Sequence, residues 1–411
     1  MGKKASLEAI IRIDSQLNQI RDADLLLERI LFEARQVVGA DAGSIYVKEG
    51  EMLQIRYAQN DTKQRELPPG TKLLYSVVKI PINEQSIAGF CALHKKVVNV
   101  EDAYAIPSNA PYSFNSSYDR LVGYRTRSIL AVPLVTPEKK LLGVIQVINK
   151  KIKENAVGRF TQKDELFISH FANNATVALE RALMTRTMLL RMIRMAELRD
   201  PKETGAHVNR VAGYAVEIYE RWAFRHNVAK QEREKYKDIL RIAAMLHDVG
   251  KVAISDVILK KPGPLTPEEY RIMQSHTVYG AHLFDDPQSD LDLVARDIAL
   301  THHENWDGSG YPGWSAIPEP AAGALETEGE QQRSGGRKGE GIPLAGRIVA
   351  VADVFDALIS RRVYKEAWDE EKVYEEIRRL SGTKFDPEIV ECFFEALPHI
   401  QQVRQLYPDA S

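Results

Sequence analysis

One long helical pattern, beginning at Thr161, limits this chain more than any other feature because it joins two halves of unlike character. Thr161 is a plausible N-cap, and Asp164 occupies the position of the acid in a capping box. Small and apolar side chains then recur at alternating spacings of four and three residues, and only Arg186 breaks the series. The stripe consists of Ile168, Ala172, Ala175, Leu179, Ala182, Leu189, Ile193 and Ala196.

A 3.5-residue period of this length favours a two-stranded coiled coil. We therefore predict a linker helix over residues 161–200, and a homodimer held together through this helix and the domain that precedes it. The alternative is that the stripe packs on its own domain. A helix of this kind can transmit the state of a sensor to an output domain.

The half that precedes this helix mixes helical and strand-like patterns. Amphipathic helices are predicted over residues 1–20 and 25–38. Strand-like runs follow at residues 43–47, 53–58, 127–135 and 141–149. These patterns predict an α/β domain over residues 21–183, with an antiparallel sheet and flanking helices.

The half that follows Pro201 has only helical patterns, which predict an all-α helical bundle over residues 201–411. Two of its helices have clear start signals, Thr266-Pro267-Glu268-Glu269 and Asp386-Pro387. The predicted helices span residues 205–227, 231–249, 267–281, 290–303, 344–361, 369–380 and 386–397.

Length and charge narrow the class of protein. A chain of 411 residues has room for two or three domains, and a net charge of -2 gives no global basic field for a DNA or RNA polymer. Only Cys91 and Cys392 are present, which fits a reducing cytoplasm and excludes a disulfide framework. No apolar run is long enough for a membrane span.

Histidines and carboxylates gather at the ends or inner faces of the predicted helices in the C-terminal half. His247 and Asp248 end a strongly apolar helix, and the pair at 302–303 ends another. Asp353 lies in an apolar helix that should be buried, and a carboxylate is rarely buried unless it is paired or bound to metal. The candidate metal ligands are Glu203, His207, His247, Asp248, His276, His302, His303 and Asp353.

Each of these residues alone has a structural explanation. A histidine near a helix C-terminus is favoured by the helix dipole, and Glu203 is favoured at a helix N-terminus, without any metal. Taken together, the His-Asp and His-His pairs favour a metal site. Histidine and carboxylate ligands without thiolates suit iron or manganese better than a structural zinc or an iron–sulfur cluster.

The N-terminal half resembles a GAF sensor domain over about residues 20–183. The resemblance depends on Asn149-Lys150, then Phe160, then Asp164-Glu165. A structural interpretation of the same pattern is an ion pair between Lys150 and Asp164, so the pattern does not establish a nucleotide ligand. A small ligand of unknown identity is left open. His94 is interpreted as an ordinary surface or core residue rather than a haem ligand.

The C-terminal half resembles the HD-GYP subfamily of the HD phosphohydrolase superfamily, over about residues 195–400. The order His207…His247-Asp248…Asp353, the further residues His276 and His302-His303, and the turn Gly310-Tyr311-Pro312 are those of this subfamily. The resemblance implies a phosphodiesterase that linearises cyclic di-GMP to pGpG, and whether pGpG or GMP is the final product stays open. Three alternatives stay open. The protein could prefer cyclic GMP-AMP, it could be a catalytically weak scaffold that binds cyclic dinucleotides, or it could be a sensor whose main function is to bind a ligand in the GAF domain.

The resemblance also implies a role for each ligand. Asp248 bridges two metals, His247 and Asp353 complete one metal's shell, and His276, His302 and His303 serve mainly its neighbour. Glu203 would be a ligand of a third metal, so three ions are favoured over two. Two metals held close together lower the pKa of a bridging water and clamp the phosphodiester oxygens.

Substrate contacts are implied as well. Lys251 would contact the scissile phosphate and stabilise charge in the transition state. Tyr311 offers a flat face for guanine in a turn fixed by Gly310, and Arg362 and Lys365 would bind phosphates. Asp356 lies one turn from Asp353. It is predicted to hydrogen-bond to a metal ligand, on the side away from the metal, or to a water.

The chain departs from the subfamily after the Gly-Tyr-Pro turn. Residues 313–335, rich in Gly, Ala, Glu and Pro, form an inserted loop before Ile342-Pro343-Leu344. The loop adjoins Tyr311, so it is either a lid over the substrate or a tolerated surface loop. The pair Arg361-Arg362 replaces the more common acidic-Arg pair.

Overall fold

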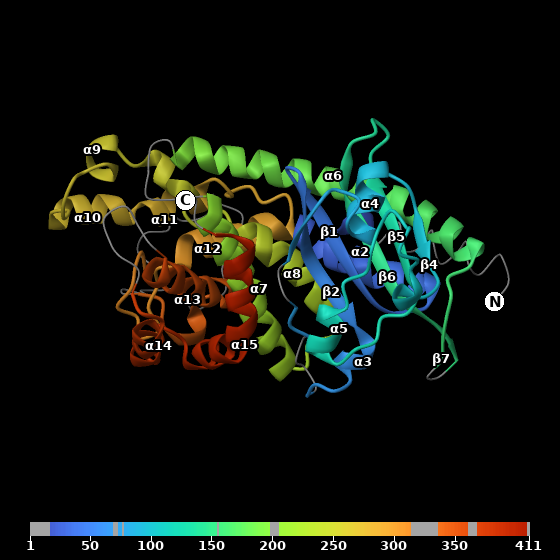
Figure 1. Cartoon of the computed structure of the whole chain (residues 1–411). Coiled ribbons are helices and arrows are strands. Elements are labelled where there is room, and N and C mark those ends of the chain that lie inside the picture. Colours follow the sequence, from blue (N-terminus) through green and yellow to red (C-terminus); the bar gives the residue numbers. More distant parts are fainter. Residues whose placement is uncertain are drawn as a thin grey trace. The chain divides into compact units, whose positions relative to one another are not determined.

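A computed structural model describes residues 17–68, 73–75, 78–153, 156–197, 205–313, 336–360 and 368–408. The chain divides into two compact units, Met1–Thr187 and Met188–Ser411. Figure 1 shows the strands of the first unit in blue to teal and the helices of the second in yellow-green to red. The division falls inside the long helix α6 (Gln162–Glu197).

The first unit contains one antiparallel sheet in the order β3-β2-β1-β6-β5-β4, with β7 paired to β6. Three of the four predicted strands lie inside longer observed ones, whereas the strand predicted over 127–135 begins only at Ile129. The strands are β1 (Ala40–Glu49), β2 (Met52–Asn60), β3 (Lys79–Pro81), β4 (Val98–Val100), β5 (Ile129–Val135), β6 (Leu141–Lys153) and β7 (Ala156–Gly158). The predicted antiparallel α/β architecture is confirmed.

Alternation along β5 separates two cores on the two faces of this sheet. Leu130, Val132 and Leu134 pack with α2 (Ala23–Val38) and α6, whereas Ile129 and Ala131 pack with α4 (Ile87–His94). The short helices of this unit are α3 (Asp61–Gln64), α5 (Ser117–Val122) and the 3-10 turn η1 (Ala103–Ala105). The sheet is therefore covered on both faces.

The ends of α2 follow from its sequence. The Asp22 side chain accepts hydrogen bonds from the backbone N–H groups of Asp24 and Leu25, at 2.9 and 3.0 Å. Gly39 ends the helix with φ 64°, a left-handed conformation that glycine adopts at no cost. Of the helix predicted over 1–20, residues 17–20 belong to the described chain, and residues 17–19 are helical.

The stripe on α6 packs within its own domain. The members that lie within the GAF-like unit are buried in the core shared with α2 and the sheet, so they are not a free seam for a second chain. These members are Ile168, Ala172, Ala175, Leu179 and Ala182. The argument from this stripe to a coiled coil is therefore wrong for residues 168–182, because the same period serves packing on the sheet.

The second unit is a helical bundle, as predicted. Its core is built mainly from α7, α8, α12, α13, α14 and α15. The helices are α7 (Gly205–Arg225), α8 (Lys230–Ala244), α9 (Asp256–Leu259), α10 (Pro267–Gln274), α11 (His276–His282), α12 (Asp290–Thr301), α13 (Leu344–Ile359), α14 (Glu370–Arg379) and α15 (Pro387–Leu406), with 3-10 turns η2 (Val249–Ala253) and η3 (Gly339–Gly341).

Three predicted helix boundaries are wrong. The helix predicted over 231–249 ends at Ala244, after which i→i+3 hydrogen bonds tighten the chain into η2. The helix predicted over 267–281 divides at Ser275, whose N–H bonds to Ile272 O at 3.2 Å. The helix predicted to end at 397 continues through Pro398 to Leu406.

No helix in the described part of the chain is both long and apolar enough to cross a bilayer.

Candidate metal centre

Five segments of the second unit bring the predicted ligands together. His207 lies in the first turns of α7, His276 begins α11, and Asp353 lies on α13. The pair His247-Asp248 lies in the turn between α8 and η2, and the pair at 302–303 directly follows α12. All but one of the described candidate ligands thus lie at or near helix ends, where a short turn can aim a side chain inward.

The ligand atoms form two groups, and within each group the atoms lie within 4.8 Å of one another. One group is Asp248, His276, His302 and His303; the other is His207, His247 and Asp353. His247 and Asp353 thus fall in one group, which His207 joins, and His276, His302 and His303 fall in the other.

Asp248 lies between the two groups with one oxygen toward each. Its Oδ1 is 3.1 Å from His276 Nε2 and 3.6 Å from His302 Nε2. Its Oδ2 is 3.3 Å from His247 Nε2, and that nitrogen is 4.0 Å from Asp353 Oδ1. A carboxylate placed in this way has the geometry of a bridging ligand.

The imidazole rings are oriented from behind by backbone carbonyls. The Nδ1–H of His247 donates to Ala244 O at 2.9 Å, that of His276 to Met273 O at 2.7 Å, and that of His302 to Ile298 O at 2.9 Å. These bonds fix the tautomer that leaves Nε2 as a lone-pair donor facing the centre.

Two of these lone-pair atoms face one another: His276 Nε2 and His302 Nε2 are 3.5 Å apart. Because both rings use Nδ1–H for a backbone bond, neither Nε2 is a donor to the other. A cation between them and Asp248 would relieve this contact. The residues present therefore fit a metal ion.

His207 is held by a side chain rather than by the main chain. Its Nδ1 is 2.8 Å from Asp356 Oδ2, while its Nε2 is 3.6 Å from Asp353 Oδ1. Asp356 also accepts hydrogen bonds from Arg210 Nε at 2.6 Å and from the Tyr214 hydroxyl at 3.1 Å. Asp356 lies in the predicted position behind a ligand, but Arg210 and Tyr214 had no signal in the sequence.

Burial and charge keep these groups in the forms that bind metal. Burial lowers the pKa of His302 and holds that of His303 well below its ordinary value, so both rings are neutral. Burial alone would raise the pKa of Asp248, but Lys251 and His247 hold it well below its ordinary value. Neutral imidazoles around an ionised carboxylate are a ligand set for a divalent cation.

Lys251 lies at this site, as predicted. Its Nζ is 2.7 Å from Asp248 Oδ2, and its side chain is about one-fifth exposed. An amine held there adds a positive charge where an anionic substrate would meet the metal ligands.

Two glycines bring the His247-Asp248 turn against α11. A Cβ added to Gly250 would lie 1.9 Å from His276 O and 2.3 Å from Gly280 N. Backbone therefore contacts backbone at this point, and no larger residue fits at 250 without displacing His276.

Tyr311 lies beside the second ligand group. Its ring lies 4.8 Å from the His303 ring with a 33° tilt, and its N–H donates to His303 O at 3.2 Å. One face of Tyr311 is thus turned toward His303, which limits the stacking face expected there. A Cβ at Gly310 would lie 2.2 Å from Asn305 N, so Gly310 is required by the tightness of the turn.

Glu304 closes the base of the inserted loop, a role that was not predicted. This carboxylate is 2% exposed, and its Oε1 accepts a hydrogen bond from Gly313 N at 2.7 Å. A backbone hydrogen bond from Arg337 also acts on it, so one side chain binds both stems of the insertion. Nearby, a Cβ at Gly336 would lie 2.2 Å from Gly308 O, so the C-terminal stem packs closely against the backbone of Gly308.

Three predicted site residues, Glu203, Arg362 and Lys365, lie outside the described residues, as do residues 314–335 of the insertion. Their predicted roles therefore stay predictions.

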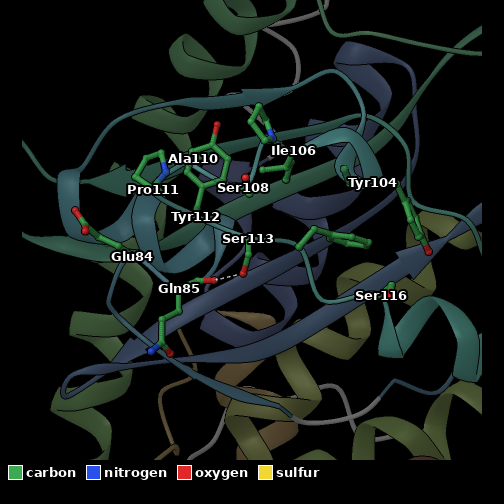
Figure 2. A pocket seen from close by; sticks show the side chains of 13 residues that line it. Glu84, Gln85, Tyr104, Ile106, Ser108, Ala110, Pro111, Tyr112, Ser113 and Ser116 are labelled. Atoms are coloured by element: carbon green, nitrogen blue, oxygen red, sulfur yellow. Dashed lines mark hydrogen bonds between the residues drawn. The ribbon is translucent and has the colours of Figure 1, made fainter.

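A cavity of about 460 Å³ opens in the first unit, and its lining residues lie between Glu84 and Ser116 (Figure 2). Aromatic rings of Tyr104, Tyr112 and Phe114 line it together with serines, and Ser113 Oγ donates to Gln85 O at 2.8 Å.

His94 bonds Glu84 at 2.9 Å. Lys150 and Asp164 form a 2.7 Å ion pair between β6 and α6, which is the structural interpretation of the Asn-Lys…Asp-Glu pattern.

Comparison with curated proteins gives three similar relatives of the second half. A 3'3'-cGAMP-specific phosphodiesterase 2 from Vibrio cholerae is 41% identical over 208 residues, covering 51% of this chain and 34% of that protein. A cyclic di-GMP phosphodiesterase of the same species is 38% identical over 222 residues, covering 53% and 40%. A cyclic di-GMP phosphodiesterase from Thermotoga maritima is 40% identical over 209 residues, covering 51% and 48%.

The chain spans less than half the length of each of these relatives. Family models match in both units: the GAF domain over residues 22–179 and the HD domain over residues 204–358. Both resemblances found in the sequence are therefore confirmed at the level of the domain. This chain therefore contains a GAF domain over residues 22–179, followed by an HD domain over residues 204–358.

Proposed function

We propose that this protein is a metal-dependent phosphodiesterase that hydrolyses cyclic di-GMP to pGpG, and pGpG onward to GMP. The observation that supports this most is Asp248, which directs one carboxylate oxygen toward each of two histidine groups. The names of the relatives, with the domain shared by them, support the substrate class.

His207, His247 and Asp353 would hold one divalent ion, and His276, His302 and His303 a second, with Asp248 bridging. We propose iron or manganese, since the ligands are imidazoles and carboxylates without thiolates. Bound metals supply an activated water and a clamp on the phosphodiester oxygens. Glu203 would serve a third ion, and three ions are favoured over two.

The substrate phosphate would lie against Lys251, whose amine is already at the ligand cluster. Tyr311 would contact a base with whatever face His303 leaves open, in the turn fixed by Gly310. Arg362 and Lys365 are proposed to bind phosphate oxygens, for which a guanidinium gives a bidentate contact.

The test is direct turnover. Protein reconstituted with iron(II) or manganese is incubated with cyclic di-GMP, and the products are separated by HPLC. We expect pGpG, followed by GMP, and no product with Asp248→Ala at equal protein concentration. Fully metallated protein that turns over neither cyclic di-GMP nor cyclic GMP-AMP would refute the enzyme. Dinucleotide binding without turnover would support a signalling scaffold instead.

A preference for cyclic GMP-AMP is the second candidate. It is favoured by the relative named as a cGAMP-specific phosphodiesterase, which is 41% identical over 208 residues. Competition between the two cyclic dinucleotides in one reaction, followed by HPLC, measures the ratio of kcat/KM directly.

We infer that the GAF domain regulates this activity through a small ligand. The cavity lined by Tyr104, Tyr112 and Phe114 is of ligand size and mixes aromatic rings with hydroxyl groups. Its ligand and the sign of the regulation stay open. Location in the cytoplasm is also proposed, and two buried, unbridged cysteines fit a reducing compartment.

We propose a homodimer through the other side of α6. Val177, Met184, Met188 and Met192 are 55%, 58%, 50% and 64% exposed, and their spacings of seven, four and four place them on one face. That face is opposite to the buried stripe. A second copy of the same helix would cover these side chains.

A further inference from the structure

The helix α10, which provides no metal ligand, begins at a rigidly built first turn. Thr266 Oγ1 accepts from Glu269 N at 3.3 Å, and Glu269 Oε2 accepts from Thr266 N at 2.7 Å, so a complete capping box is present. Pro267 occupies the first helical position, and Lys261 binds the Glu269 carboxylate at 2.5 Å. The side chain of the next residue, Tyr270, therefore extends from a backbone that has little conformational freedom.

Tyr270 presents its ring to Tyr311. The two ring centroids are 6.3 Å apart with an interplanar angle of 77°, so the rings meet edge to face. The Tyr311 ring continues to His303 at 4.8 Å and to His276 at 6.4 Å. An unbroken series of rings thus runs from α10 to the metal ligands.

The exposure of Tyr270 is the second observation. Its side chain is 48% exposed although one edge is in contact with Tyr311, so a broad part of the ring faces solvent beside the cluster. Tyr311, by contrast, is only partly exposed and is turned toward His303. The open aromatic surface next to the metal ligands therefore belongs to Tyr270 more than to Tyr311.

We propose that Tyr270 is a second nucleobase-contacting residue, which takes one purine of the cyclic dinucleotide into the right-angled corner that it forms with Tyr311. This inference rests on the proposed function, because it assumes a cyclic dinucleotide as the substrate. A purine can lie flat on one ring of such a corner while its edge meets the other. Stacking on an aromatic side chain is tolerant of the base, so Tyr270 adds affinity for a purine without choosing guanine over adenine.

The location of Tyr270 predicts an effect on binding and not on chemistry. It is linked to the ligand cluster only through Tyr311 and bonds to no metal-ligand candidate in the described chain. Loss of its ring should raise KM while kcat stays near its original value, which is the signature of a contact equally strong in the ground state and the transition state.

The experiment compares Tyr270→Ala, Tyr270→Phe and Tyr270→Leu in the full metallated chain. Tyr279→Ala is the matched control, because Tyr279 is a similarly exposed tyrosine (45%) on the neighbouring helix α11. Steady-state turnover of cyclic di-GMP is measured together with that of bis(p-nitrophenyl) phosphate, which has no purine. Binding of a non-hydrolysable phosphorothioate analogue of cyclic di-GMP is measured by calorimetry.

We expect Tyr270→Ala and Tyr270→Leu to raise KM for cyclic di-GMP, and Kd for the analogue, about tenfold. Tyr270→Phe and Tyr279→Ala should stay within twofold of the unmodified protein, and all four should hydrolyse bis(p-nitrophenyl) phosphate at close to its rate. Thermal unfolding checks that each variant is folded.

The outcomes separate the two hypotheses. If the unmodified protein turns over cyclic di-GMP and Tyr270→Ala has an unchanged KM and Kd, the role of Tyr270 is refuted and the enzyme stands. If the unmodified protein binds the analogue without turnover, and Tyr270→Ala binds it tenfold more weakly, the enzyme is refuted and the base contact stands. If the unmodified protein neither binds nor hydrolyses, both are refuted.

Discussion

At the scale of single residues, His207 is the ligand whose orientation depends most on another side chain. Its Nδ1 bonds Asp356 Oδ2 at 2.8 Å, and Asp356 is in turn held by Arg210 and Tyr214. A carboxylate in this position orients the ring and fixes its tautomer. The metal group of His207 therefore depends on residues that touch no metal.

Replacing this carboxylate should weaken metal binding. We expect Asp356→Asn to lower the affinity for manganese by about 10- to 100-fold, the usual effect of removing a partner behind a ligand. Calorimetric titration of the metal-free protein measures the change. Asp285→Asn, an exposed carboxylate that bonds His282, is the control and should bind as before. Equal affinity for both variants would contradict the role of Asp356.

The ionised Asp356 carboxylate should also make the folding stability of the metal-free protein depend on pH. Burial would raise the pKa of this carboxyl, but His207 and Arg210 hold it below its ordinary value, so the ionised form stabilises the fold. Its contribution is present above the pKa of the unfolded chain, about 4, and is lost as the pH falls below that value.

Urea unfolding with a chelator present, at pH 7 and near pH 3, measures this contribution. At pH 7 we expect Asp356→Asn to lose about 3–5 kcal/mol, because the buried Arg210 guanidinium loses the carboxylate that it contacts at 2.6 Å. Near pH 3 the two proteins should differ less. A difference that is independent of pH would show that Asp356 is not ionised in the fold.

Site residues could be predicted where a local sequence pattern marks them, and could not where only the fold brings their partners close. His247, Asp248 and His302 are recognisable because pairs and spacings along the chain mark them. Arg210, Tyr214 and Glu304 act through partners that are far away in sequence or in an insertion, so no local pattern marks them. Tyr270 is of the second kind, since only the fold brings it to Tyr311.

At the scale of elements, the sequence predicted which helices exist better than where they end. The helix predicted over 231–249 was extended through His247 because apolar residues continue past Ala244. The contact between Gly250 and Gly280 requires a tighter turn there, and a hydrophobic pattern does not contain that information. The α6 stripe shows the same limit, because its period fits both a partner helix and its own sheet.

The contact between η2 and α11 should not tolerate a methyl group. We expect Gly250→Ala to destabilise the protein by about 1–3 kcal/mol and to abolish full metal loading, because the added Cβ would overlap His276 O and Gly280 N. Thermal unfolding and metal content measure the two effects. Gly205→Ala, whose Cβ would meet no atom of the described residues within 4 Å, is the control. Full loading of Gly250→Ala would refute the close contact.

The exposed face of α6 gives a separate prediction on assembly. We expect the double variant Met184→Glu, Met188→Glu to run as a monomer in light scattering where the unmodified chain runs as a dimer, because four charges would face one another across the pair. Met184→Leu, Met188→Leu keeps the apolar surface and should stay dimeric. A dimer that survives the glutamates would place the interface elsewhere.

At the scale of the whole molecule, the ligands all belong to the second unit and the ligand-sized aromatic cavity to the first. Each unit has cores of its own. Binding at the metal centre should therefore stabilise the second unit and leave the first unchanged.

Calorimetric unfolding with and without manganese tests this. At a free metal concentration of about 100 times Kd, we expect the second unit to gain about 2.7 kcal/mol, seen as an upward shift of one transition. Asp248→Ala should show no shift. If manganese moves both transitions equally, the two units do not unfold independently.

The carbonyl bonds behind the imidazoles have a consequence for mutational robustness. His247, His276 and His302 are aimed by acceptors of the main chain three or four residues earlier, and no substitution can delete a main-chain carbonyl. His207 alone among these four is aimed by a side chain, Asp356, which one base change in a gene can remove. Random mutagenesis should therefore damage the two halves of the centre unequally, and sequence drift should disable the His207 half first.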